Sequence, residues 1–287
     1  MSSEDRARAL VEKAEKKLSS WSLFSSGSKF EDASEMYVKA ANLFKVAKCW
    51  NDAGMCFEKA AGCHLKCDSP HEAATAYTEA ANCYKKTDAK MAVLQYKEAV
   101  GIQIDLGRFQ SAAKLQKEIA ELHEAEGNLL KAMEAFQTAA DYYQGEESTT
   151  QANQCLLKVA DFAATSSDFK KAVEIYEQVA ISSLENNLLK WSAKDYFLRA
   201  GICHLAGSEA GTAVSAVERY KSLDASFEST REGTFLDAIT RAYGAADADA
   251  FTDLVREYDE VSRLDPQKTS LLLEVKNKIK AQVNDLT

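Results

Sequence analysis

The residues best suited to chemistry in this sequence are a run of four cysteines with one histidine. Their spacing is C-x6-C-x6-C-x3-C, with members Cys49, Cys56, Cys63, His64 and Cys67. Zinc sites usually take their cysteines from pairs separated by about two to four residues, so this spacing does not suit zinc. Cys56 and Cys63 are seven positions apart, which places them on one face of a helix. We therefore predict cysteines of a hydrophobic core and expect no bound metal.

The histidines offer no clear route to catalysis. The sequence has four of them, His64, His71, His123 and His204, and none accompanies a nucleophile motif. It contains no G-x-S-x-G, no P-loop, no G-x-G-x-x-G and no H-E-x-x-H. We expect neither enzymatic activity nor a cofactor, and in particular no nucleotide hydrolysis. The alternative, an enzyme or metal protein that uses these cysteines and histidines, is tested by a metal assay of the purified chain.

The elements that carry these residues repeat along the chain. Alanine recurs every 19 to 21 residues, an aromatic residue usually follows four positions later, and mostly small residues stand at offsets seven and eight. These offsets share one face of a helix. The nine repeated alanines are Ala33, Ala53, Ala73, Ala92, Ala112, Ala132, Ala152, Ala172 and Ala193. Two such repeats form a helical hairpin of about 40 residues, so we predict an all-α, tetratricopeptide-like solenoid of antiparallel hairpins.

The repeat weakens after residue 207, which predicts a second domain. We place the solenoid at 1–207 and a C-terminal helical bundle at 208–287. Within the bundle we expect three helices, near 231–245, 249–263 and 266–284. Such a bundle closes the open end of a solenoid, which otherwise exposes apolar surface.

A loop at 19–30 follows a charged amphipathic helix expected at 3–20. The loop is rich in Ser and Gly, yet it carries Trp21, Leu23 and Phe24. These side chains either dock onto the first hairpin of the protein itself or insert shallowly into a membrane. Burying one such side chain is worth roughly 1.5–3 kcal/mol, which gives weak, reversible attachment that acts beside another contact.

Charge is unevenly distributed over the chain. The net charge is −9, which disfavours nucleic acid as a main partner. Residues 81–120 hold seven Lys/Arg against four Asp/Glu, a net of +3, whereas residues 244–265 hold seven acids against two arginines, a net of −5. The odd number of cysteines, the lack of an apolar run of about 20 residues and an N-terminus unlike a signal peptide lead us to expect a reducing, cytoplasmic setting.

Several basic residues are candidates for a partner surface. Lys114 and Lys158 stand at offsets two and six of their repeats, about 200° and 240° around the helix, opposite a core face centred near about 25°. We therefore predict that both face solvent. The basic residues form either an ordinary solvated face or a track for an acidic, elongated partner.

Several segments are similar to the alpha-type soluble NSF attachment proteins. They span most of the chain in the family's order, and they are LFKVAKCWNDAG (43–54), LGRFQSAAK (106–114), GEESTTQANQCLLKVADFAA (145–164), AVEIYEQVA (172–180), LLKWSAKDYF (188–197) and REYDEVSRLD (256–265). The resemblance implies a twisted sheet of helical hairpins followed by a C-terminal bundle. It also implies an adaptor, of which several copies wrap the four-helix SNARE bundle and recruit the hexameric ATPase NSF, which pulls the bundle apart.

The resemblance assigns roles to individual residues. The implied SNARE-binding set is Lys48, Lys85, Lys86, Arg108, Lys114, Lys158 and Lys194, with apolar contact from Leu189. The implied NSF-binding set is Glu257, Asp259, Glu260, Asp285 and Leu286. Trp21, Leu23 and Phe24 would touch the membrane, which implies a cytoplasmic protein peripherally associated with membranes. Gln154 departs from the family, in which lysine precedes the CLLK segment.

A generic tetratricopeptide-like scaffold that binds a short peptide is the alternative function. A scaffold of that kind needs its basic residues clustered within one groove. Here they are spread over about 150 positions, which favours an elongated partner.

Overall fold

The computed structural model describes residues 2–20, 26–207 and 210–285, and within these ranges it contains helices and no strand. The α-helices are α1 (Ser3–Ser19), α2 (Ser26–Val46), α3 (Trp50–Lys66), α4 (Pro70–Tyr84), α5 (Ala89–Asp105), α6 (Phe109–Ala125), α7 (Leu129–Gly145), α8 (Thr149–Thr165), α9 (Phe169–Leu184), α10 (Ala193–Gly207), α11 (Ala210–Leu223), α12 (Arg231–Gly244), α13 (Ala248–Val261) and α14 (Pro266–Asp285). Two short 3-10 helices are η1 (Lys190–Ser192) and η2 (Phe227–Ser229). The predicted all-α class is confirmed.

The chain divides into two compact units, Met1–Ala152 and Asn153–Thr287. The division falls inside α8, at the seventh of the repeated alanines. The boundary predicted at residue 207 marks the end of the alanine repeat, and it stays a prediction, as does the grouping of the last helices into a separate bundle.

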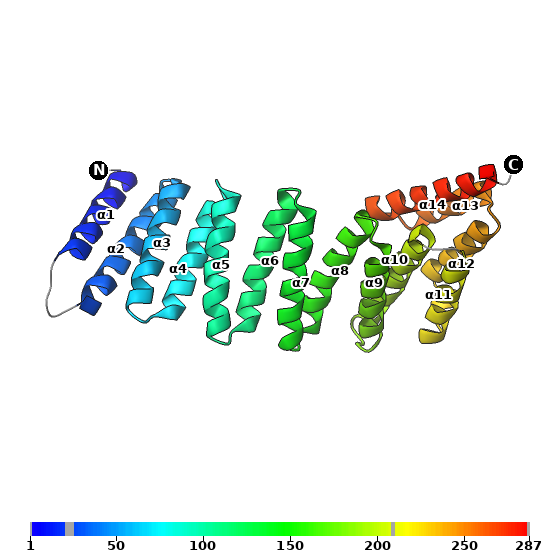
Figure 1. Cartoon of the computed structure of the whole chain (residues 1–287), viewed down its shortest axis with the longest axis horizontal. Coiled ribbons are helices and arrows are strands. Elements are labelled where there is room, and N and C mark those ends of the chain that lie inside the picture. Colours follow the sequence, from blue (N-terminus) through cyan, green and yellow to red (C-terminus); the bar gives the residue numbers. More distant parts are fainter. Residues whose placement is uncertain (1, 21–25, 208–209, 286–287) are drawn as a thin grey trace. The chain divides into compact units, whose positions relative to one another are not determined.

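In the first unit each helix packs against the next helix of the chain, from α1 on α2 through to α6 on α7. Successive helices run in opposite directions (Figure 1). The α2–α3, α4–α5 and α6–α7 connections therefore share one edge of the unit, and the α3–α4 and α5–α6 connections share the other. This is the stack of helical hairpins that the alanine repeat predicts.

The connections repeat as regularly as the helices. Seven residues with a left-handed backbone stand at matching positions, with φ between 53° and 74°, at Lys48, Asp68, Gly107, Gly127, Glu147, Ser167 and Ala246. A left-handed residue ends a helix and turns the chain, and glycine adopts that conformation without strain. The α4–α5 connection lacks such a residue, and there Asp88 caps α5 by accepting hydrogen bonds from the backbone N–H groups of Lys90 and Met91 at 3.0 and 3.1 Å. Asp88 and Asp168 are N-caps, as their sequence positions predict.

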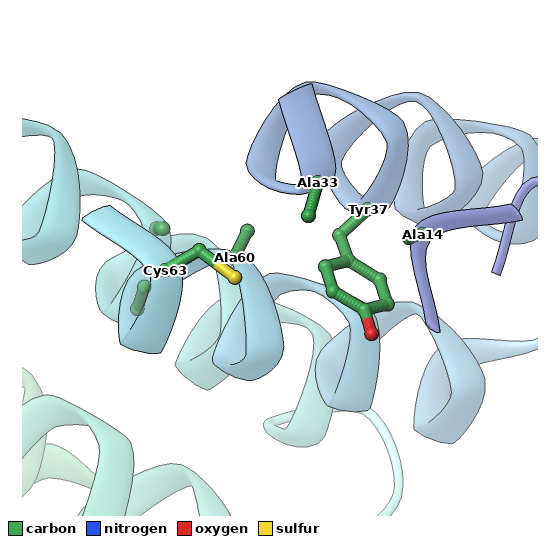
Figure 2. Close-up of a cluster of buried hydrophobic side chains, with 7 residues drawn as sticks. Ala14, Ala33, Tyr37, Ala60 and Cys63 are labelled. Atoms are coloured by element: carbon green, nitrogen blue, oxygen red, sulfur yellow. The ribbon is translucent and has the colours of Figure 1, made fainter. Parts of the chain in front are cut away.

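The predicted core face is confirmed in both units. All nine repeated alanines are at most 1% exposed, and most aromatic residues at offset four are buried as well. Figure 2 shows one such cluster, where the ring of Tyr37 lies among Ala14 of α1, Ala33 of α2 and Ala60 of α3. Alanine at these positions lets neighbouring helix backbones approach closely while the aromatic rings fill the remaining space.

The cysteines of the predicted core face are core residues. Cys56 and Cys63 are 4% and 5% exposed. Burial raises the pKa of the Cys56 thiol to about 11. The thiol is therefore protonated at neutral pH and has the low reactivity of a structural cysteine.

In the second unit α10 is the most deeply buried helix, and it packs against α9, α12 and α14. The ring of Phe197 on α10 stacks on Tyr220 of α11 at 4.6 Å and meets Phe227 edge-on at 5.6 Å. A Cβ atom added at Gly201 would stand within 3.0 Å of the Leu236 side chain, so any larger residue there would force Leu236 of α12 to move. The three helices predicted after residue 230 are confirmed as α12, α13 and α14.

Candidate partner-binding surfaces

Five of the predicted basic residues lie in the first unit, and all five are exposed. Lys48 lies in the α2–α3 connection, and Lys85 and Lys86 directly follow α4, so these three share one edge of the unit. Arg108 precedes α6 at the opposite edge, and Lys114 lies within α6. The set therefore extends from one edge of the unit to the other instead of forming one compact cluster.

The five basic residues of the first unit differ in whether they form an ion pair. The Lys85 Nζ lies 2.6 Å from the Glu118 carboxylate, and both side chains are about 40% exposed. An exposed pair of this kind is worth about 0–1 kcal/mol, so an acidic partner can replace Glu118 at little cost. The other four form no ion pair with another described residue, and they are Lys48, Lys86, Arg108 and Lys114.

In the second unit the two predicted lysines differ in their surroundings. Lys158 is exposed on α8, with its Nζ 6.0 Å from the centre of the Phe162 ring. Lys194 on α10 lies 3.1 Å from the Glu232 carboxylate of α12, which is only 14% exposed. Lys194 therefore also ties α10 to α12. The prediction that Lys114 and Lys158 face solvent is confirmed.

The α9–α10 connection presents apolar side chains beside a lysine. The predicted contact residue Leu189 is only partly exposed, whereas Leu188 is 88% exposed and Trp191 is 73% exposed. The Lys190 Nζ lies 5.5 Å from the centre of the Trp191 ring, within the range of a cation–π contact. The exposed apolar surface of this connection therefore belongs to Leu188 and Trp191.

The predicted acidic set lies on α13 and at the end of α14. Glu257 and Glu260 are exposed on α13. Asp259 is already engaged, because its carboxylate accepts a hydrogen bond from the Leu264 N–H at 2.8 Å and pairs with Arg263 at 3.2 Å. Asp285 is the last residue of α14.

Four predicted contact residues lie outside the described residues. They are Trp21, Leu23 and Phe24 of the predicted membrane loop, and Leu286 near the C-terminus.

No group of three or more His, Cys, Asp or Glu side chains among the described residues is placed to hold a metal ion. No helix of the described ranges combines the length and the apolar character needed to cross a bilayer.

Comparison with known proteins connects these surfaces to a family. The family model described as soluble NSF attachment protein, SNAP, matches residues 5–280. The chain is a member of this family. The alpha-soluble NSF attachment protein of Dictyostelium discoideum is 50% identical over 290 residues, covering 100% of both chains. That of Vitis vinifera is 47% identical over 285 residues, covering 98% of both chains. The vesicular-fusion protein SEC17 of Coprinopsis cinerea is 42% identical over 285 residues, covering 98% of this chain and 99% of its own.

In this SNAP the exposed pair Leu188 and Trp191 is a feature that sequence reasoning missed. The family resemblance assigned the apolar contact to Leu189. Sequence alone cannot tell which of Leu188, Leu189 and Trp191 is exposed, because all three are large and apolar. The sequence did contain a signal for an exposed apolar surface here, because several large apolar residues stand next to a helix joint, where polar residues are usual. The backbone path through η1 decides which of these side chains point outward.

A second missed feature of this SNAP is a partly buried cluster of charged side chains around Arg199 on α10. The guanidinium donates hydrogen bonds to Asp195 at 2.9 Å and to Asp265 at 2.7 Å, and it lies 3.6 Å from Asp161. Lys268 of α14 completes the cluster at 2.5 Å from the Asp195 carboxylate. The cluster joins α8, α10 and α14.

The cluster shifts the acidity of its members in opposite directions. Burial raises the pKa of Asp161, despite hydrogen bonding from the Tyr176 hydroxyl and the nearby charge of Arg199. Burial also acts to raise the pKa of Asp265, but the Lys268 N–H, Arg199 and the Lys268 ammonium outweigh it, and the net shift is downward. The cluster thus holds Asp265 as a carboxylate by direct contact with cations.

Proposed function

We propose that this protein is an adaptor that binds assembled SNARE complexes and recruits the ATPase NSF, which disassembles them during vesicle fusion and transport. The observation that carries the proposal is family membership over residues 5–280. Its relatives are named for attachment to NSF and for vesicular fusion. The adaptor itself needs no catalytic group, because the ATPase supplies the work.

The basic residues support the SNARE-facing part of this proposal. An assembled SNARE bundle is long and carries acidic surface, and cations distributed over a wide area match such a partner better than one deep pocket does. Four of the five basic residues of the first unit carry charge that no described acid neutralises. Each contact is weak, so we infer that several copies around one bundle act together through their high effective concentration.

We also place Leu188 and Trp191 in the SNARE-facing surface of the second unit. An exposed tryptophan beside a lysine combines a large apolar contact area with a nearby positive charge. Such a pair fits the surface of a helical bundle, where apolar side chains lie next to acidic ones.

The acidic end supports the ATPase-facing part. Glu257 and Glu260 are exposed on one helix of a protein with a net charge of −9. Opposite charge on the NSF N-domains would speed their encounter with this end and select it over other surfaces.

The first prediction concerns ATP turnover. Adding the protein to NSF and a preassembled SNARE bundle is expected to stimulate turnover several-fold, and Leu286→Ala is expected to remove most of this stimulation while leaving SNARE binding intact. Turnover is measured with the SNARE bundle present and absent. A folded protein that gives no SNARE-dependent stimulation would overturn the proposed adaptor function.

The second prediction concerns the basic surface. Changing both Lys114 and Lys158 to glutamate is expected to weaken binding to the SNARE bundle by at least about tenfold, because two attractive contacts become repulsive. The melting temperature should stay unchanged, since both side chains are exposed. The matched control changes exposed Lys131 and Lys170 to glutamate, which alters net charge equally. Equal weakening in both pairs would point to overall charge and would remove Lys114 and Lys158 from the site.

The third prediction concerns the membrane. We propose that Trp21, Leu23 and Phe24 attach the protein weakly to the bilayer that anchors the SNAREs. Changing all three to serine is expected to slow disassembly of liposome-anchored SNARE complexes and to leave soluble complexes unaffected, because apolar insertion acts only where a bilayer is present. The control changes three exposed leucines, Leu65, Leu94 and Leu130, to serine. Equal loss on soluble and anchored complexes would show that the loop serves folding instead.

A further inference from the structure

An apolar groove runs between α12 and α13 in the second unit. Its volume is about 340 Å³. The lining includes Phe235 and Ala238 from α12 and Leu254, Tyr258 and Val261 from α13, and one cation, Arg231 at the start of α12, also lines it. None of the residues discussed for SNARE binding lines it, and of the predicted ATPase-facing residues only Glu257 does.

Aromatic side chains pack against each other where the two helices of the groove meet. The rings of Phe235 and Tyr258 stack across the two helices at 4.1 Å with an angle of 18° between their planes. Val261, at the end of α13, is 63% exposed. A stacked pair of rings beside an exposed branched side chain forms a preformed binding site for an apolar group. Few side chains have to rearrange when such a site is occupied.

A stripe of acidic residues borders the groove. Glu257 lies on its rim, and Asp253 and Glu260 stand four positions before and three positions after it on the same helix. Residues three and four apart are neighbours on a helix surface, so these three carboxylates form one row along α13. Arg256 pairs with Asp253 at 3.0 Å, but no described cation pairs with Glu257 or Glu260.

We propose that this groove receives a single aliphatic or aromatic side chain that projects from a basic surface of the NSF N-domain. The inference rests on the proposed function and adds an apolar anchor to it. The acidic row selects a basic partner and repels the acidic SNARE bundle. The volume is at the small end of the range of about 300–1,000 Å³ that is usual for ligand sites, so it suits one or two side chains and not a whole helix.

Two opposite changes to the groove provide the test. Ala238→Trp fills the groove and Val261→Ser removes apolar surface from its end. Each is expected to weaken binding of NSF to the preformed complex of full-length protein and SNARE bundle by about tenfold, which corresponds to the loss of one buried apolar side chain. SNARE binding should not change. The matched control is Val214→Ser on α11, where the valine is 46% exposed and lies outside the groove.

The dependence of NSF binding on salt concentration distinguishes the apolar contact from the charged one, because salt screens only charges. The dissociation constant for NSF is measured at several salt concentrations for each variant. Glu260→Gln should reduce the dependence on salt, because it removes a charge, whereas Val261→Ser should weaken binding equally at every concentration. A loss in Val261→Ser that disappears at high salt would show that the groove acts only through charge, and it would overturn the proposal.

Other outcomes are equally decisive. Unchanged NSF affinity in both groove variants, with melting temperatures equal to wild type, would mean that the groove stays empty in the complex. If Glu260→Gln then still weakens binding, the adaptor function stands and only the groove proposal fails. If the wild-type protein does not bind NSF at all, both proposals fail.

Discussion

Phe136→Ala is expected to lower the free energy of unfolding of the first unit by about 3–5 kcal/mol. Phe136 is 1% exposed at offset four of the sixth repeat, and it is among the largest fully buried side chains of the protein. Three of its neighbours on the same helix face are the buried alanines Ala132, Ala139 and Ala140. These short side chains cannot fill the space left by the ring, so we expect much of the cavity to remain.

The control for this prediction is Phe109→Ala on the preceding helix. Phe109 is 38% exposed, with its ring 6.1 Å from that of Tyr142, so its loss should cost about 1 kcal/mol. Urea unfolding followed by circular dichroism measures both variants, and hydrogen exchange at α6 and α7 locates the effect. Equal losses in the two variants would contradict the assigned core register.

Arg199→Met is expected to destabilise the second unit by about 1–3 kcal/mol at pH 7, because its acidic partners are each about one-third exposed and solvent screens them. The Arg199 side chain is 21% exposed, and its guanidinium contacts Asp195, Asp265 and, at longer range, Asp161. Methionine fills much of the volume but leaves these carboxylates partly buried with less compensating charge. The matched control is Arg241→Met, because Arg241 is 77% exposed and its pair with Asp237 should be worth about 0.5 kcal/mol or less.

The Arg199 prediction has a definite dependence on pH. The folded-state pKa of Asp265 is depressed, so its stabilisation is present above the unfolded pKa and is lost as the pH falls through the folded pKa. Arg199→Met removes part of that stabilisation, and at low pH its carboxylate neighbours are protonated. The difference between variant and wild type should therefore shrink as the pH falls below about 4, the ordinary pKa of an aspartate. Urea midpoints measured from pH 7 down to about pH 3 test this, and a difference that stays constant below about pH 4 would show that packing, and not charge, accounts for the loss.

The regular part of the fold follows closely from the sequence. Ala33, Ala112 and Ala172 are buried in three different repeats because a period near twenty residues returns the same face of each helix to the same neighbours. α4 begins at Pro70 and α5 directly follows its N-cap Asp88, and helix starts of this kind depend only on residues close in sequence.

The roles of the acidic residues in 244–265 could not be predicted from the sequence. Residues 244–265 read as one acidic surface, but three of their acids serve the fold. Asp247 caps α13 by accepting a hydrogen bond from the Ala250 N–H at 2.9 Å, Asp259 accepts one from the Leu264 N–H, and Asp265 binds Arg199. Glu257 and Glu260 remain exposed. Counting charge in a segment cannot separate these cases, because the partner of Asp265 lies 66 positions away.

By itself the sequence determined most of the helices, the core face of each repeat and the family, all of which depend on patterns within about 20 residues or on motifs read in order. The loop predicted at 19–30 was wrong from residue 26 onward, because α2 begins at Ser26. Only the tertiary structure decided which charges are neutralised, which of Leu188, Leu189 and Trp191 face outward, and that α12 and α13 leave an apolar groove between them. These outcomes depend on distances between side chains that are remote in sequence and on the direction of a single short turn, and periodicity carries no information about either.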